Sequence, residues 1–126
     1  MNKVYNPGTV APGTGYSHGV ELAAGARVLY IAGQLGVTPD GSFARDIKGQ
    51  AEQAWRNIQA VLAAAGMSLE NLIKVNHYLT RKEDIAGYRE VRARMLGDHK
   101  PASTLLVISA LAREEALVEV EAVAAK

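Results

Sequence analysis

The chain has 126 residues, of which 48% are hydrophobic and 21% are charged, and it contains no cysteine. This composition fits a single globular domain over residues 1–126 and excludes disordered and fibrous classes. A net charge of +1 gives no electrostatic support to nucleic-acid binding, and the lack of cysteine excludes disulfides, thiolate metal sites and cysteine nucleophiles.

The first third of the chain is predicted to form short strands joined by turns. Residues 6–15 are rich in proline and glycine, so we expect a surface loop after a short first strand. Residues 16–22 are predicted to form a second strand. The continuous apolar run of residues 27–32 is typical of a buried strand. Pro39-Asp40-Gly41 indicates a turn.

Two segments carry the three- and four-residue apolar period of amphipathic helices. The first covers residues 46–65, and Gly66 is expected to form its glycine C-cap. The second carries apolar residues over 85–95 and ends at Gly97. Residues 80–83, Thr-Arg-Lys-Glu, have the spacing of a capping box at its start.

Three further strands are predicted over residues 71–79, 104–108 and 117–124, so the element order is β-β-β-α-β-α-β-β. This order indicates an α+β sandwich with two helices on one face of a sheet. The other face is left bare. Because both sides of the strands at 28–32 and 104–108 are apolar, we expect that face to pack against copies of the same chain.

The last strand places Glu119 and Glu121 on one face and Val118, Val120 and Ala122 on the other. Two carboxylates on one strand face are best tolerated in water, at a subunit seam or in a ligand cleft. An exposed strand face kept soluble by glutamate is the plain alternative. The pattern alone leaves both interpretations open.

Several other residues are given structural interpretations. His77 falls in the apolar register of its strand and is predicted to be an interior or interface histidine. Trp55 follows the helix period and is predicted to be core or interface. No histidine has metal-ligand spacing and no nucleotide fingerprint is present, so we expect no metal and no cofactor. The basic residues near the second helix are interpreted as a solvated face: Arg81, Lys82, Arg89, Arg92 and Arg94.

A series of short motifs resembles the RidA family, also called YjgF. In chain order the motifs are Tyr16-Ser17-His18, Ala32-Gly33-Gln34, Gln50-Ala51-Glu52-Gln53, Asn57-Ile58, the Leu-Ala-Ala-Ala-Gly run at 62–66, Leu72-Ile73-Lys74-Val75, Pro101-Ala102, and residues 118–124. None is specific alone, but their order and spacing are specific together. The resemblance covers nearly the full length. It implies a chorismate-mutase-like fold with a mixed sheet, and a homotrimer assembled around the sheets.

The best-known members of that family hydrolyse reactive 2-imino and enamine acids to 2-oxo acids and ammonia in clefts between subunits. The resemblance implies that an arginine holds the substrate carboxylate and that a glutamate of the last strand orients water. Glu121 matches that glutamate and is the expected catalytic residue. Partial shielding would be expected to raise its pKa. Tyr16 and Gly33 match two further positions that line the cleft. The structural alternatives are a Glu121 carboxylate paired with a lysine or arginine across the trimer seam, a Tyr16 ring that fills the edge of the sheet, and a bulge at Gly33 at a strand end.

The chain departs from the family pattern at three positions. Ser103 stands where deaminase members carry the arginine after Pro-Ala, which removes the charged fork. Ala32 replaces the serine that usually precedes Gly-Gln. Arg89 replaces an asparagine of the second helix, and is either a substitute cation or a solvated helix residue. Ser103 and Thr104 offer neutral hydroxyls, either to a polar ligand or as strand-edge caps.

These observations leave two principal hypotheses of function. The first is an enzyme that hydrolyses an imine, an enamine or a related bond, with Ser103, Thr104, Tyr16 and Arg89 holding the substrate. The second is a trimer that binds a small metabolite without turning it over, which the loss of the arginine favours. An endoribonuclease role is not favoured, because the sequence indicates no basic or aromatic surface strip that would bind RNA. We expect a cytoplasmic protein with no membrane partner, since no signal core or membrane-length apolar run is present.

Overall fold

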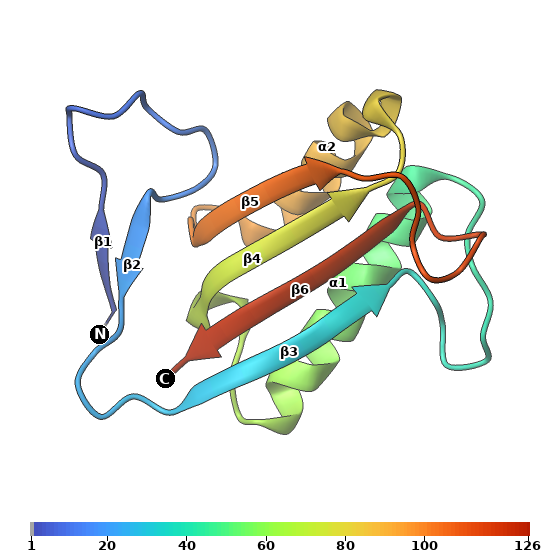
Figure 1. Ribbon diagram of the computed structural model, residues 1–126. Coiled ribbons are helices and arrows are strands. Elements are labelled where there is room, and N and C mark those ends of the chain that lie inside the picture. Colours follow the sequence, from blue (N-terminus) through green and yellow to red (C-terminus); the bar gives the residue numbers. More distant parts are fainter. Residues whose placement is uncertain (1) are drawn as a thin grey trace.

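The computed structural model describes residues 2–126 and contains a four-stranded sheet with two helices on one face. In Figure 1 the sheet faces the viewer and both helices lie behind it, while a small two-stranded sheet stands to one side. The strands are β1 (Lys3–Tyr5), β2 (Gly19–Glu21), β3 (Val28–Leu35), β4 (Leu72–Leu79), β5 (Ala102–Val107) and β6 (Val118–Ala125). The helices are α1 (Ile47–Ala64) and α2 (Ile85–Leu96), with short 3-10 helices η1 (Leu69–Asn71) and η2 (Lys82–Asp84). The predicted element order and the α+β class are confirmed.

The larger sheet has the strand order β3-β6-β4-β5 and is mixed. Strand β6 runs antiparallel to both of its neighbours, whereas β4 and β5 are parallel. A parallel pair needs a crossover connection, which α2 supplies between β4 and β5. The C-terminal strand β6 is one of the two inner strands of the sheet, between β3 and β4. Its residue Glu121 is paired in register with Asn76 of β4.

The face of the sheet that meets the helices forms the core. Along β6, Val118, Val120 and Ala122 are buried, in the predicted alternation. Trp55 of α1 is fully buried, as is His77 of β4, so both predictions of interior residues are confirmed. This core explains why α1 keeps its apolar period along its length.

The opposite face of the sheet is uncovered in the single chain. It carries the largest exposed apolar side chain on the sheet, Tyr30, which is 80% exposed. Val28 and Leu106 are exposed on the same face, at its two edge strands. The predicted bare face is thus present, and its apolar side chains are concentrated on β3 and β5.

The C-terminus of α1 has the predicted glycine cap. Gly66 adopts φ +70°, a left-handed conformation that costs glycine little. Its amide donates to the Ala63 carbonyl at 3.0 Å, and the Met67 amide donates to the Leu62 carbonyl at 2.9 Å. This pair of bonds is a Schellman motif, which satisfies two of the last carbonyls of the helix.

Two local predictions are wrong. The second strand covers only Gly19–Glu21, because Ser17 pairs instead with Ala102 of β5 in a single parallel bridge. The predicted capping box at 80–83 is replaced by the 3-10 turn η2, which delays the start of α2. Arg81 donates from two nitrogens to the buried Asp84 carboxylate, at 2.8 and 3.1 Å, and this pair stabilises the turn.

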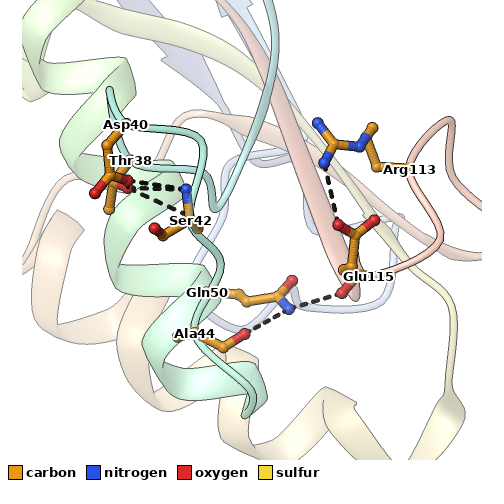
Figure 2. Close-up of polar contacts among 7 residues, drawn as sticks. All are labelled: Thr38, Asp40, Ser42, Ala44, Gln50, Arg113 and Glu115. Atoms are coloured by element: carbon orange, nitrogen blue, oxygen red, sulfur yellow. Dashed lines mark hydrogen bonds and ion pairs between the residues drawn. The ribbon is translucent and has the colours of Figure 1, made fainter.

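Gln50, in the first turn of α1, joins the two loops that flank the sheet (Figure 2). Its Nε2 donates to the carbonyls of Ala44 and Glu115, each at 2.9 Å. Its Oε1 accepts from the Leu117 amide at 2.7 Å, immediately before β6 begins. The Gln50 side chain is 1% exposed, so its own polar atoms depend on these three bonds in place of water. Gln50 therefore fixes the start of β6 against α1.

Replacing Gln50 with alanine is expected to lower the free energy of unfolding by about 2–3 kcal/mol. The change leaves two carbonyls and one amide without their buried partner, at roughly 1 kcal/mol for each lost hydrogen bond. Urea unfolding followed by circular dichroism measures the difference. Gln59→Ala, at an exposed position of the same helix, is the matched control and is expected to change stability by less than about 0.5 kcal/mol. Equal stability of Gln50→Ala and the control would contradict the role given to Gln50.

Candidate functional site

Most of the predicted site residues line one of two pockets of the chain. The arginine pocket is lined by Pro12, Thr14, Tyr16, Arg89, Arg92, Ser103 and Leu105. The glutamate pocket is lined by Tyr30, Ile31, Ala32, Lys74, Asn76, Glu121, Ala122 and Val123. Three predicted residues, Tyr16, Arg89 and Ser103, thus share the first pocket, and Ala32 and Glu121 share the second. Gly33 and Thr104 line neither.

Ser103 and Thr104 lie on opposite faces of β5, because successive side chains of a strand alternate. The Ser103 Oγ points toward the helices and lies 2.9 Å from Nε2 of His77. Thr104 points to the bare face, where its hydroxyl accepts a hydrogen bond from Lys74 Nζ at 2.8 Å. In one protomer the two hydroxyls therefore do not meet the same ligand.

A buried chain of hydrogen bonds holds the Ser103 side chain. His77 bonds through Nδ1 to the Tyr88 hydroxyl of α2 and through Nε2 to Ser103. The Tyr88 side chain is fully buried, and among residues 2–126 Nδ1 is the one acceptor bonded to its hydroxyl. We infer that Tyr88 donates to Nδ1, so that Nε2 carries the hydrogen and donates to Ser103. The hydroxyl hydrogen of Ser103 is then free to point into the arginine pocket.

His77 is held in its neutral form. Burial lowers the pKa of His77 to about 3, with smaller contributions from the charges of Arg92 and Lys74. Protonating it at pH 7 would cost roughly 5 kcal/mol, at about 1.4 kcal/mol per pKa unit. His77 is therefore no general base for Ser103, although the spacing of the two resembles a nucleophile–base pair. Its role is to position the serine hydroxyl.

Arg92 is a pocket residue that the sequence interpretation missed, because it was assigned to a solvated helix face. The side chain is half-buried, and burial lowers the pKa of its guanidinium below the usual value. The loop ahead of β2 closes over it: a Cβ at Gly15, which has φ +77°, would lie 3.1 Å from Arg92 Nη2. The available signal was its position next to Val91 in the apolar register of α2, one helical turn after Arg89.

Glu121 lies on the bare face of the inner strand β6. Only one of its two carboxylate oxygens accepts hydrogen bonds from residues 2–126. Its Oε1 accepts hydrogen bonds from the Tyr78 hydroxyl and from Asn76 Nδ2, the latter at 3.1 Å. These two bonds, with Tyr78 first, lower the pKa of Glu121, so the expected rise in its pKa is wrong. Glu121 is ionised at neutral pH. Within residues 2–126, Oε2 makes no hydrogen bond and remains able to orient a water molecule.

Gly33 is placed beside Glu119, at the point where the β3–β6 register shifts between Ile31 and Gln34. A Cβ at Gly33 would lie 2.0 Å from a Glu119 carboxylate oxygen, so no side chain fits there without displacing Glu119. This irregularity is a β-bulge, which the structural alternative for Gly33 predicts. It also separates Gly33 from the glutamate pocket.

Within residues 2–126 the structure lacks two kinds of feature. No group of three or more histidine or acidic side chains is placed so that it could hold a metal ion. None of the helices in this part of the chain is both long and apolar enough to cross a membrane.

Removing the His77 imidazole is expected to make stability less dependent on pH between 6.5 and 3. As the pH falls through this window, the unfolded chain binds a proton at His77 that the folded chain does not bind. The native free energy of unfolding should therefore fall by about 1 kcal/mol more than that of His77→Gln between pH 6 and pH 5. Urea unfolding at the two pH values measures this. Equal slopes for the native chain and His77→Gln would refute a neutral buried His77.

Comparison with known proteins gives consistent matches over nearly the whole chain. A sequence model described as Endoribonuclease L-PSP matches residues 8–126. A RutC family protein of Pyrococcus horikoshii is 43% identical over 100 residues, or 78% of this chain and 79% of that protein. The solved structure of YyfB, a Rid family protein of Yersinia pestis, superposes with a TM-score of 0.89 at 30% identity, covering 99% of this chain and 98% of that one.

TdcF of Escherichia coli, crystallised with bound serine, superposes with a TM-score of 0.76 at 27% identity, covering 96% of this chain and 93% of that one. Its name describes a candidate reactive intermediate deaminase. The matched family model spans far more than half of the sequence. The chain belongs to the RidA (YjgF) family, whose sequence model carries the description Endoribonuclease L-PSP.

Proposed function

We propose that this protein is a cytoplasmic homotrimer that hydrolyses an imine or enamine of a small organic acid in clefts between its subunits. The observation that carries the proposal is the free Oε2 of Glu121, on an ionised carboxylate fixed by Tyr78 and Asn76. A fixed acceptor of this kind orients a water molecule for attack. The name of TdcF as a candidate reactive intermediate deaminase, and its crystal structure with serine, support a ligand of this size.

The reaction adds water across a C=N bond. The water oxygen bonds to the imine carbon while the nitrogen takes up a proton, which gives a carbinolamine. The hydroxyl proton then passes to the amino nitrogen, the C–N bond breaks, and ammonia leaves to give the 2-oxo acid. Glu121 accepts a hydrogen bond from the attacking water through Oε2, which holds the water lone pair toward the carbon. No redox partner is needed.

The division of the site between two pockets supports an assembly. Arg89, Arg92 and Ser103 line one pocket, whereas Glu121 lines the other, so one chain does not bring these two arginines to Glu121. The exposed Tyr30, which lines the glutamate pocket, lies on the bare sheet face. We propose that a neighbouring protomer covers this face and completes the cleft with its arginine pocket.

A non-catalytic metabolite-binding trimer is the second candidate. The observation that favours it is the lowered pKa of Glu121, because such a carboxylate is a weak general base. The serine at position 103 favours it as well, because a serine supplies no charged fork at that place.

Hydrolysis of 2-iminopropanoate generated in situ, followed by the loss of semicarbazide trapping, separates the two candidates. Glu121→Gln is expected to lower kcat by 10- to 100-fold, since the amide presents a weaker acceptor to water. Glu114→Gln, in an exposed loop, is the control and should keep the native rate. Activity that appears only in Ser103→Arg would indicate a vacated deaminase site, and no activity in any chain would favour the binding module or another substrate.

Introducing a charge at Tyr30 is expected to separate the subunits. Tyr30→Glu would bury a carboxylate in the proposed interface, which disfavours association by several kcal/mol. Light scattering should then give 13.4 kDa, the mass of one chain, in place of three times that mass for the native protein. Gln59→Glu on the helix side is the control for added charge. A native mass of 13.4 kDa would remove the inter-subunit cleft from the proposal.

A further inference from the structure

We propose that Arg92 anchors a compact dianion in the arginine pocket, with Arg89 supplying the second positive charge. The ligand class is a small molecule that presents two carboxylates or one phosphate group. The inference rests on the proposed function and deepens it, because it assigns the charge that Ser103 lacks to a different element, helix α2.

The unpaired state of the Arg92 guanidinium is the first support. The side chain is half-buried, yet within residues 2–126 no carboxylate oxygen lies within 4.0 Å of it. A neighbouring arginine of the same helix, Arg94, pairs with Glu52, whereas Arg92 turns instead toward Gly15 and the pocket. A partly desolvated charge without a counterion favours an anion from outside the chain.

The composition of the pocket is the second support. Its lining contains two guanidinium groups, three hydroxyl-bearing side chains and no acidic residue. Arg89 and Arg92 are three residues apart on α2 and so lie on one helix face. Their mutual repulsion lowers the pKa of Arg92 further, and a single negative charge would leave one of the two unmatched. A doubly charged ligand neutralises both.

The third support is the direction of the Ser103 hydroxyl. Because Nε2 of His77 donates to the Ser103 oxygen, the serine hydrogen is available as a donor to an anion. Tyr16 and Thr14 add hydroxyls to the same pocket. Neutral donors beside a charged fork are suited to the several oxygens of a dicarboxylate or phosphate group.

Titration calorimetry of the whole protein with unreactive anions at constant ionic strength tests the inference. The probes are malonate, inorganic phosphate and acetate. Malonate or phosphate should bind the native chain more tightly than acetate, and the tighter of the two identifies which dianion the pocket takes. Arg92→Met is expected to weaken that binding by on the order of 30-fold, as for a lost charge-assisted contact. Arg89→Met should weaken it by about threefold, because Arg89 is exposed.

Arg92→Lys and Arg56→Met provide the controls. Arg92→Lys keeps the charge without the planar fork of the guanidinium. Its affinity for the anion should lie between that of the native chain and that of Arg92→Met. Arg56 is exposed on α1, and Arg56→Met should bind as the native chain does. The inference is overturned if Arg92→Met binds malonate and phosphate as well as the native chain, or if acetate binds as tightly as both.

Glu121→Gln separates this inference from the proposed function. The variant should keep anion binding, since Glu121 lines the other pocket. If the native chain does not hydrolyse the imine but still binds anions in an Arg92-dependent way, only the proposed function is overturned. Native hydrolysis without Arg92-dependent binding would overturn only the assignment of the anchor.

Discussion

The alternation of side chains along β6, the central strand, governs both the core and the candidate site. One set of residues, including Val118 and Val120, is sealed against the helices, which fixes the orientation of the strand. The other set must then project from the bare face, and it includes Glu121. A shift of one residue would bury the carboxylates and expose the core, so the register is strongly determined. Gln50 adds a second constraint, because it holds the chain where β6 begins.

The same alternation of side chains along β5 explains why its polar residues contact different parts of the structure. Ser103 lies beneath the sheet beside His77, and Thr104 lies above it beside Lys74. Ser103 is consequently only partly exposed, and its hydroxyl oxygen is held in place. It is held by a neutral, buried histidine, which in turn is held by Tyr88. The Tyr88 hydroxyl and both ring nitrogens of His77 are thus paired, as buried polar groups require.

The two pockets differ in their charged groups. Two guanidinium groups dominate the arginine pocket, whereas an ionised glutamate faces the other, with Lys74 beside it. Complementary surfaces of this kind favour association of copies in a defined orientation. In the proposed reaction the arginines hold the organic acid and the Glu121 carboxylate accepts from the attacking water. The family membership of the chain and the geometry of its pockets are therefore consistent with each other.

The sequence by itself determined the order of the elements, the helix cap at Gly66, the burial of Trp55 and His77, and the face on which Glu121 lies. These features follow from local periodicity and from single-residue conformational preferences, which act over a few residues. It did not determine the 3-10 turn before α2, whose Arg81–Asp84 pair competes with the capping box.

Only the tertiary structure decided which side chains share a pocket. Arg92 is unremarkable in a basic helix, and becomes a pocket residue because the loop at Gly15 closes over it. The pKa of Glu121 is lowered by Tyr78 and Asn76, which belong to a strand more than 40 residues earlier in the chain. Burial, solvent exclusion and hydrogen bonding between distant segments depend on three-dimensional packing, and no short-range pattern in a single sequence encodes them.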